Sequence, residues 1–99
     1  MYGNRAGLSG PTREYVRNRL SSLLQEICHR TPEEIQDTAT IDRELEMESV
    51  QMVELQVAVE TEFDITLDFL EVLRLNSFRR ITEYVHALAS ASADSSAAS

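Results

Sequence analysis

Residues 45–64 read LEMESVQMVELQVAVETEFD, and this stretch decides how the rest of the chain is arranged. At about 100° per residue, the spacing of its apolar residues predicts a helix with one side turned toward the protein core. Four residues share that side of the predicted helix: Met52, Leu55, Val59 and Phe63.

A second apolar stripe is predicted on the same helix, turned roughly 140° from the first. It consists of Val50, Val53 and Val57, and Glu54 and Glu60 lie beside it. A helix of a small bundle needs only one buried stripe, so we expect the second one to be exposed. An exposed apolar patch framed by carboxylates is typical of a surface that binds another protein.

The length and composition indicate a single domain, which we assign to residues 11–89. Ninety-nine residues are enough for one modest core. All three glycines lie in residues 1–10, which we interpret as a flexible leader. Residues 90–99, SASADSSAAS, hold too little apolar surface to offset the entropy of ordering, so we expect a disordered tail.

The charge of the chain is acidic and concentrated in one region. There are 17 acidic residues against 9 basic ones, and residues 42–71 alone carry ten carboxylates and one arginine. The negative electrostatic potential of such a region repels nucleic acids and anionic membranes, and it attracts proteins with arginine- or lysine-lined surfaces. We therefore expect a protein partner and no nucleic acid.

Membrane insertion and disulfide bonding are not expected either. No apolar run approaches the length of a membrane span, and the N-terminus lacks the hydrophobic segment of a secretion signal. The single cysteine, Cys28, excludes an internal disulfide and a cysteine-rich zinc site. The expected setting is the reducing cytoplasm.

The body of the chain predicts an all-α fold, a four-helix bundle with three main helices, one short third helix and a long first loop. The first helix should run from Thr12 to about His29, followed by one short turn at residues 31–35. Ile41 and Leu45 should then pin the long loop to the core.

Helix-capping residues mark the later helices. The second helix should begin at Ser49, and Asp68 should cap the short third helix, with Glu71 as its reciprocal partner. Ser77 should cap the last helix. The side chains expected to face the core from these two helices are Phe69, Val72, Leu73, Ile81, Val85 and Leu88, with Phe78 and Tyr84 at the flanks.

The sequence contains no recognisable catalytic or metal-binding motif. His29 and His86 occupy polar or terminal positions of separate helices, outside any nucleophile or metal motif. Cys28 precedes His29, but neighbours along a helix point about 100° apart. The acidic run lacks the spacing of a calcium loop. We therefore expect no catalytic residue and no metal site, with most carboxylates on a solvated face.

Ser49 is distinguished by its position in the chain. It follows an acidic loop and precedes a helical run, where the N-cap of a helix would fall. Met52, three residues later, cannot complete a capping box. Capping is the simplest role for such a serine. A phosphate attached there would also be stabilised by the unpaired N–H groups and the positive end of the helix dipole.

The stretch around Ser49 resembles a known signature. LEMESV at residues 45–50, followed by VELQVAVETEFDI, is similar to the LGxDSL…VELxxxLEEEFxI pattern of acyl carrier proteins. The resemblance covers about residues 12–89, because the order of four helices, the long first loop and the final SFRRITEYV segment also match. The chain departs from the pattern at three positions: Glu46 replaces glycine, Glu48 replaces aspartate and Val50 replaces leucine.

This resemblance implies a carrier without catalytic activity of its own. Ser49 would hold a 4′-phosphopantetheine arm from coenzyme A, which makes the chain a phosphoprotein, and the arm would carry acyl or aminoacyl-type starter groups as thioesters in polyketide or other secondary-metabolite biosynthesis. The implied partners are a phosphopantetheinyl transferase, an acyltransferase or acyl-loading enzyme, and a ketosynthase. We expect a monomer whose partner-binding residues are Glu48, Val50, Val53, Glu54 and Val57.

Two other interpretations stay open at this point. Peptidyl carriers have a GGxSL-like stretch, which residues 46–50 resemble less, so a peptidyl carrier is the second interpretation. An unmodified helical module that binds a basic partner through the same stripe is the third. The opening methionine favours a free-standing protein, whereas the Ser/Ala tail would suit a linker of a larger synthase. We expect a free-standing protein.

Overall fold

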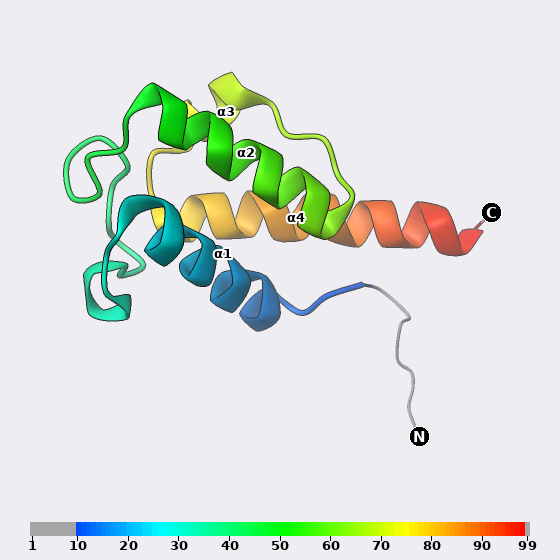
Figure 1. Ribbon diagram of the computed structural model, residues 1–99. Helices are drawn as coiled ribbons and strands as arrows, with labels where there is room; N and C mark the ends of the chain where they lie inside the picture. Colours follow the sequence, from blue (N-terminus) through cyan, green and yellow to red (C-terminus); the bar gives the residue numbers. More distant parts are fainter. Residues whose placement is uncertain (1–9, 99) are drawn as a thin grey trace.

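The computed structural model describes residues 10–98, with side-chain surroundings through Ser92. In this range the chain forms four α-helices and one 3-10 helix (Figure 1). They are α1 (Arg13–Cys28), η1 (Pro32–Glu34), α2 (Ser49–Phe63), α3 (Phe69–Leu75) and α4 (Phe78–Ala98). The predicted all-α fold with a long first loop is confirmed. Residues 1–9 of the predicted leader lie outside the described residues.

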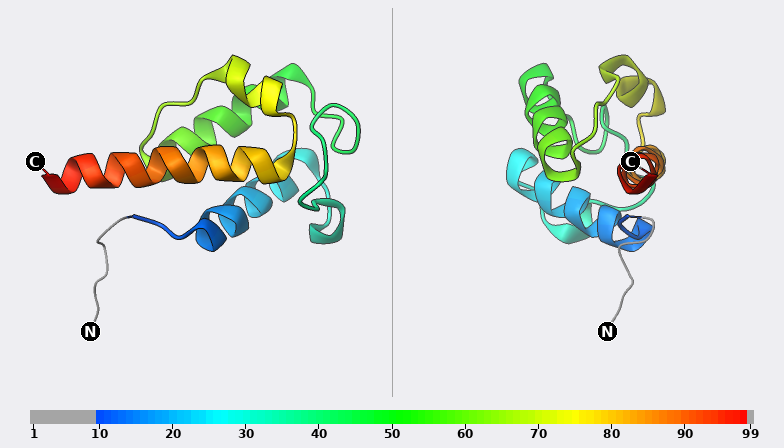
Figure 2. Two further views of the ribbon diagram at one scale, coloured as in Figure 1. Left: turned by 180° about the vertical axis from the view of Figure 1, so that it is seen from behind. Right: turned by 90° about the vertical axis from the view of Figure 1, so that its right-hand side faces the viewer.

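One apolar core holds the helices together. α1 packs against both α2 and α4, and α3 packs against α4 (Figures 1 and 2). Isolated helices of this length are marginal in water, whereas each fully buried aliphatic or aromatic side chain contributes about 1.5–3 kcal/mol relative to exposure. The shared core is therefore the main source of helix stability. Its buried members include Val16, Leu20, Leu24, Ile35, Ile41, Leu45, Met52, Leu55, Val59, Leu67, Val72, Phe78, Ile81 and Val85.

The caps predicted at Asp68 and Ser77 are present, and Thr12, the predicted start of the first helix, caps α1. The hydroxyl of Thr12 accepts a hydrogen bond from the backbone N–H of Tyr15, at 3.1 Å. One carboxylate oxygen of Asp68 accepts the N–H groups of the first turn of α3, at 3.0 and 3.3 Å. The hydroxyl of Ser77 accepts the N–H of Arg80, at 3.2 Å. Each cap satisfies a backbone donor that the helix itself leaves without a partner.

The long loop between α1 and α2 is fixed to the core and to the start of α4 by residues 39–45. Ile41 and Leu45 are buried, as predicted. The loop also pairs with the start of α4: Thr40 and Ser77 form an isolated antiparallel bridge, and the N–H of Phe78 donates to the carbonyl of Ala39 at 2.9 Å. These contacts bring the loop against the α3–α4 junction.

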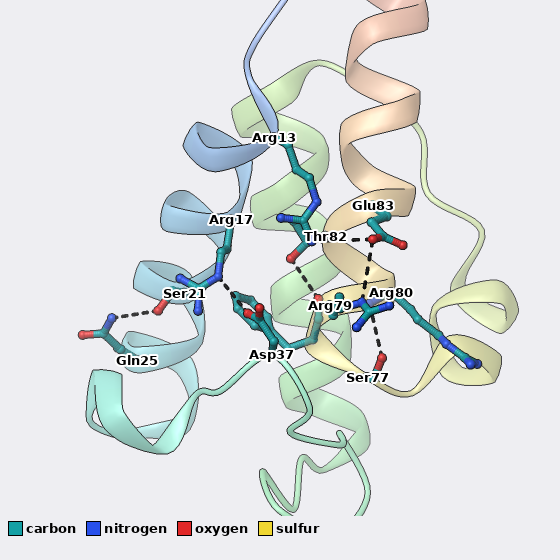
Figure 3. Close-up of polar contacts among 11 residues, drawn as sticks. Arg13, Arg17, Ser21, Gln25, Asp37, Ser77, Arg79, Arg80, Thr82 and Glu83 are labelled. Carbon is teal, nitrogen blue, oxygen red and sulfur yellow. Dashed lines mark hydrogen bonds and ion pairs between the residues drawn. The ribbon is translucent and has the colours of Figure 1, made fainter.

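Asp37, which belongs to the same loop, connects it to α1 and α4 (Figure 3). Its carboxylate accepts a hydrogen bond from Nε of Arg17 on α1 at 2.8 Å, and its carbonyl accepts the N–H of Arg79 on α4 at 2.9 Å. The guanidinium of Arg17 also lies 5.3 Å from the ring centroid of Phe78, which is within cation–π range. One loop residue therefore connects two helices that are distant in sequence.

α4 differs from the sequence prediction at its C-terminal end. The predicted disordered tail begins at Ser90, but the structure continues the helix to Ala98, and Ser99 lies outside the described residues. Once a helix is nucleated by a buried segment, each added residue costs little, and alanine has the highest helix propensity. The serine- and alanine-rich composition that argued against a core does not argue against helix extension.

The predicted side-chain directions were wrong for one residue of α3, Leu73, and one residue of α4, Phe78. Leu73 was expected to face the core but is partly exposed, and Leu70 is the most exposed large apolar residue of the described chain, at 73%. Phe78 was expected at the flank but is fully buried. Glu71, the expected reciprocal cap, forms an ion pair with Arg74 at 2.6 Å instead. α3 has only seven residues, so its neighbours rather than its periodicity decide which side is covered.

Candidate functional site

Ser49 is the first residue of α2, and its side chain is exposed. Within the described part of the chain, no side chain or backbone group forms a hydrogen bond with its hydroxyl. The start of α2 lies beside the long loop, at the end of the bundle away from the C-terminal end of α4 (Figures 1 and 2). The hydroxyl is therefore accessible from solvent.

The N-cap of α2 is Glu48, so the prediction that Ser49 occupies the cap is wrong by one residue. The backbone of Glu48 is extended, and its N–H donates to Oε1 of Gln51 at 2.8 Å. The reciprocal partner of the capping box is therefore Gln51, three residues after Glu48. The sequence analysis took Ser49 as the cap, and the residue three positions after Ser49 is Met52, which cannot act as that partner. Because Glu48 takes the capping position, the Ser49 hydroxyl is not used in capping.

Gln51 also ties the start of α2 to the end of α1. Its Nε2 donates to the carbonyl of Ile27 at 3.2 Å. Residues Glu48 to Gln51 are therefore held from two directions, by the local cap and by a contact across the bundle. The sequence analysis missed Gln51, although the glutamate–glutamine spacing of a capping pair was a usable signal.

A hollow of about 320 Å³ opens beside Ser49. It lies between the long loop, the start of α2 and α3, and its wall combines apolar side chains with a few polar ones. A flexible chain with both apolar and amide groups would find partners on such a wall. The lining residues are Ile41, Asp42, Met47, Ser49, Met52, Phe69, Leu73 and Asn76.

Asn76 shapes one wall of this hollow. It ends α3 in the left-handed conformation, which asparagine tolerates better than most residues. Its side-chain oxygen accepts the N–H groups of Ile41 and Asp42 at 3.1 and 3.3 Å, and its Nδ2 donates to Oδ1 of Asp42 at 3.1 Å. One amide group thereby fixes the loop to the α3–α4 junction.

The core beneath the hollow is tightly packed. The two voids found between the buried side chains measure about 10 Å³ each. A water molecule needs at least about 10–15 Å³ of such volume, so neither void has room for several methylene groups. A longer apolar chain could enter this core only if the helices moved apart.

The two predicted stripes of α2 are present. Met52, Leu55 and Val59 are buried, and Phe63 is half-buried. The second stripe is exposed: 62% at Val50, 50% at Val53 and 57% at Val57. Glu54 and Glu48 are exposed next to it, so the surface has the expected apolar and acidic character. Glu60, also expected beside this stripe, is only half-buried, and its Oε2 accepts the N–H of Leu67 at 2.7 Å.

Glu44 and Cys28 both have shifted pKa values. Hydrogen bonds from the hydroxyl and the N–H of Thr40, at 2.7 and 2.9 Å, hold the pKa of Glu44 below its usual range. This keeps a negative charge on the loop. Burial raises the pKa of the Cys28 thiol, with a smaller opposing effect of Arg30. The raised pKa favours the thiol over the reactive thiolate.

Other classes of site are not indicated in the described range. Among the side chains that the structure describes, through Ser92, no three or more of His, Cys, Asp or Glu are arranged to hold a metal ion. None of the helices described is both long enough and apolar enough to cross a membrane. What remains is a small helical domain that presents one serine hydroxyl at a helix start, beside a hollow and an exposed apolar stripe.

The sequence model of a family described as "Phosphopantetheine attachment site" matches residues 18–85, which is more than half of the chain. The chain belongs to this family. A comparison with curated proteins finds no significant match.

Family membership establishes the general function and confirms the resemblance to acyl carrier proteins. The chain is a carrier protein to which 4′-phosphopantetheine is covalently attached. Such carriers are substrates of partner enzymes, a phosphopantetheinyl transferase among them, and are not catalysts themselves. This carrier role explains why the sequence contains no recognisable catalytic motif.

Proposed function

We propose that this chain is an acyl carrier protein that holds acyl or aminoacyl-type starter groups as thioesters on a 4′-phosphopantetheine arm attached to Ser49. One observation carries the choice of residue: Ser49 is the exposed first residue of α2, and its hydroxyl is not engaged in capping. It also lies within the matched family region, next to a hollow that suits an arm of mixed polarity.

The attachment reaction requires little from the chain beyond this hydroxyl. The Ser49 oxygen forms a bond to phosphorus, the pyrophosphate bond of coenzyme A breaks, and adenosine bisphosphate leaves. The hydroxyl proton passes to a base that the transferase supplies. The first N–H groups of α2 and the positive end of its dipole stabilise a phosphate next to Ser49. The terminal thiol of the arm supplies the thioester linkage, which is reactive enough for acyl transfer.

The surroundings of Ser49 fit such an arm. Met47, Phe69 and Leu73 would contact its apolar part, while Asp42 and Asn76 offer polar atoms to its amide groups. Because the core voids measure only about 10 Å³ each, we propose that the acyl cargo stays in this hollow or in solvent. A cargo in this position is accessible to a partner enzyme without unfolding of the carrier.

The exposed stripe of α2 is the proposed partner surface. Val50, Val53 and Val57 would contact apolar side chains of the partner, and Glu48 and Glu54 would face its arginine or lysine residues. The proposed partners are the transferase, an acyltransferase or other acyl-loading enzyme, and a ketosynthase of polyketide or related secondary metabolism. We propose that the protein meets them as a monomer in the cytoplasm.

Intact-protein mass spectrometry tests the attachment directly. The purified chain is incubated with coenzyme A and a broad-specificity phosphopantetheinyl transferase. We expect its mass to increase by one phosphopantetheine group, with fragmentation placing that group on Ser49. An unchanged mass, under conditions in which a reference carrier is fully modified, would contradict the proposal.

Reversal of charge at Glu54 tests the partner surface. Glu54 is exposed and forms no ion pair with any side chain that the structure describes, so Glu54→Lys should leave the fold intact. We expect arm attachment to slow by about three- to tenfold at low salt, because charges at the rim of an interface act mainly on the association rate. Steady-state loading rates and circular dichroism measure the two effects.

Glu14→Lys is the matched control for this substitution. Glu14 is an exposed glutamate on the first turn of α1, at the other end of the bundle. We expect wild-type loading from this variant. Equal slowing by both substitutions would assign the effect to total charge, and a loss of helical signal from Glu54→Lys would assign Glu54 to the fold.

A further inference from the structure

Glu46 has a backbone conformation that its side chain does not favour. Four described residues other than glycine have a positive φ, and three of them, His29, Asp64 and Asn76, end α1, α2 and α3. Glu46, with φ of 49°, lies instead inside the loop, three residues before Ser49. A residue with a Cβ atom is strained in this region, whereas glycine is not. Surrounding contacts must therefore hold the turn.

Arg30 supplies such contacts. Its Nη2 donates to the carbonyl of Leu45 and to Oε1 of Glu46, both at 3.4 Å. Its Nη1 lies 3.7 Å from a carboxylate oxygen of Glu34. The side chain of Arg30 is 28% exposed, whereas that of Glu46 is 74% exposed, so Arg30 is the more buried residue of this ion pair. It connects the end of α1 to the strained turn before α2.

The backbone on both sides of Glu46 is fixed by hydrogen bonds. The N–H of Leu45 donates to the carbonyl of Thr40 at 2.9 Å, and the N–H of Met47 donates to the carbonyl of Ile41 at 3.0 Å. Met47 and Ile41 also line the hollow beside Ser49. A change of conformation at Glu46 would thus shift both the wall of the hollow and the segment that leads to Ser49.

We propose that Arg30 is a positioning residue for arm attachment. By holding the carbonyl of Leu45 and the carboxylate of Glu46, it keeps the turn before α2 in its left-handed conformation and so keeps the Ser49 hydroxyl in the orientation that a transferase needs. This inference rests on the proposed function, in which Ser49 carries the arm. Arg30 itself contacts no reacting atom.

A double-substitution cycle tests the inference. Loading by coenzyme A and the transferase is measured for wild type, Arg30→Gln, Glu46→Gly and the double variant, at several carrier concentrations. If the competent turn becomes a minor conformation in Arg30→Gln, KM for the carrier should rise about three- to fivefold while kcat stays unchanged. In the Glu46→Gly background, Arg30→Gln should have no further effect, because glycine adopts the turn without support.

Arg19→Gln is the matched control. Arg19 lies on α1 and forms a paired hydrogen bond with Glu62 of α2, at 2.8 and 3.1 Å, toward the other end of the bundle. Loss of this cross-helix ion pair should leave KM and kcat unchanged. Circular dichroism should give the same helical content for all five proteins.

The outcomes separate the inference from the proposed function. Wild-type KM for Arg30→Gln would overturn the inference alone. An equal rise in KM with and without Glu46→Gly would also overturn it, because Arg30 would then act by contacting the transferase. A wild-type chain that takes up no arm would overturn the proposed function and, with it, the inference.

Discussion

Replacement of Ser49 by alanine is expected to abolish arm attachment completely. The hydroxyl oxygen is the atom that becomes bonded to phosphorus in the proposed reaction, and no neighbouring group can substitute for it. The fold should be unaffected, because the side chain is exposed and alanine is the strongest helix former. Intact mass after exhaustive incubation with coenzyme A and transferase measures the loss, and thermal unfolding verifies the fold.

Ser22→Ala is the matched control for this result. Ser22 is an exposed serine within α1, so the same change of side chain is made away from the start of α2. This variant should gain one phosphopantetheine group at the wild-type rate. A Ser49→Ala protein that still gains the group would assign the attachment to another residue and refute the proposed site.

Replacement of Leu55 by alanine should cause the largest loss of stability among the substitutions considered. Leu55 is 3% exposed and belongs to the core side of α2. Truncation removes buried methyl groups and leaves a cavity that packed neighbours fill only in part, at a cost of about 2–5 kcal/mol. For a domain that has a total stability of about 5–15 kcal/mol, this is a large fraction. Urea denaturation followed by circular dichroism measures the change in the free energy of unfolding.

Val53→Ala supplies the comparison on the same helix. Val53 is 50% exposed, and substitutions of exposed residues usually change stability by no more than about 0.5 kcal/mol. If Val53 belongs to the partner surface, the variant should instead slow arm loading. Equal stability of the Leu55 and Val53 variants would show that the two stripes of α2 have been assigned to the wrong sides.

The sequence predicted those features that depend on residues close together along the chain. The spacing of Leu55 and Val53 was enough to assign one side of α2 to the core and the other to solvent, because the helix period alone fixes their relative directions. Asp68 and Ser77 were recognised as caps, and Thr12 as the start of the first helix, because a cap and its helix are adjacent in sequence.

The errors occurred where local patterns compete or where distant segments decide. Ser49 was placed in the cap because serine is the better N-cap residue, but Glu48 forms the cap with Gln51. The tail after Ser90 was expected to be disordered on composition, yet it continues the helix that the core nucleates. Leu73 was expected inside, although nothing in a seven-residue helix fixes which side is covered.

In the candidate site too, the sequence predicted the local features and missed those that depend on distant contacts. The sequence identified Ser49 and the exposed stripe, since both belong to one helix. It could not identify Asn76 or Arg30, because their partners, Asp42 and Glu46, lie far along the chain. It could note a glutamate where the signature has glycine, but the strain that this glutamate causes appears only in its positive φ.

The sequence by itself therefore determined the helices, the two sides of α2, the serine at its start and the acidic character of its surface. These follow from the helix period and from interactions between near neighbours. Only the tertiary structure decided which loop residues support that serine, where the hollow opens and which group caps α2. Those features arise from contacts between α1, the long loop and α3, whose approach depends on the packing of the whole core.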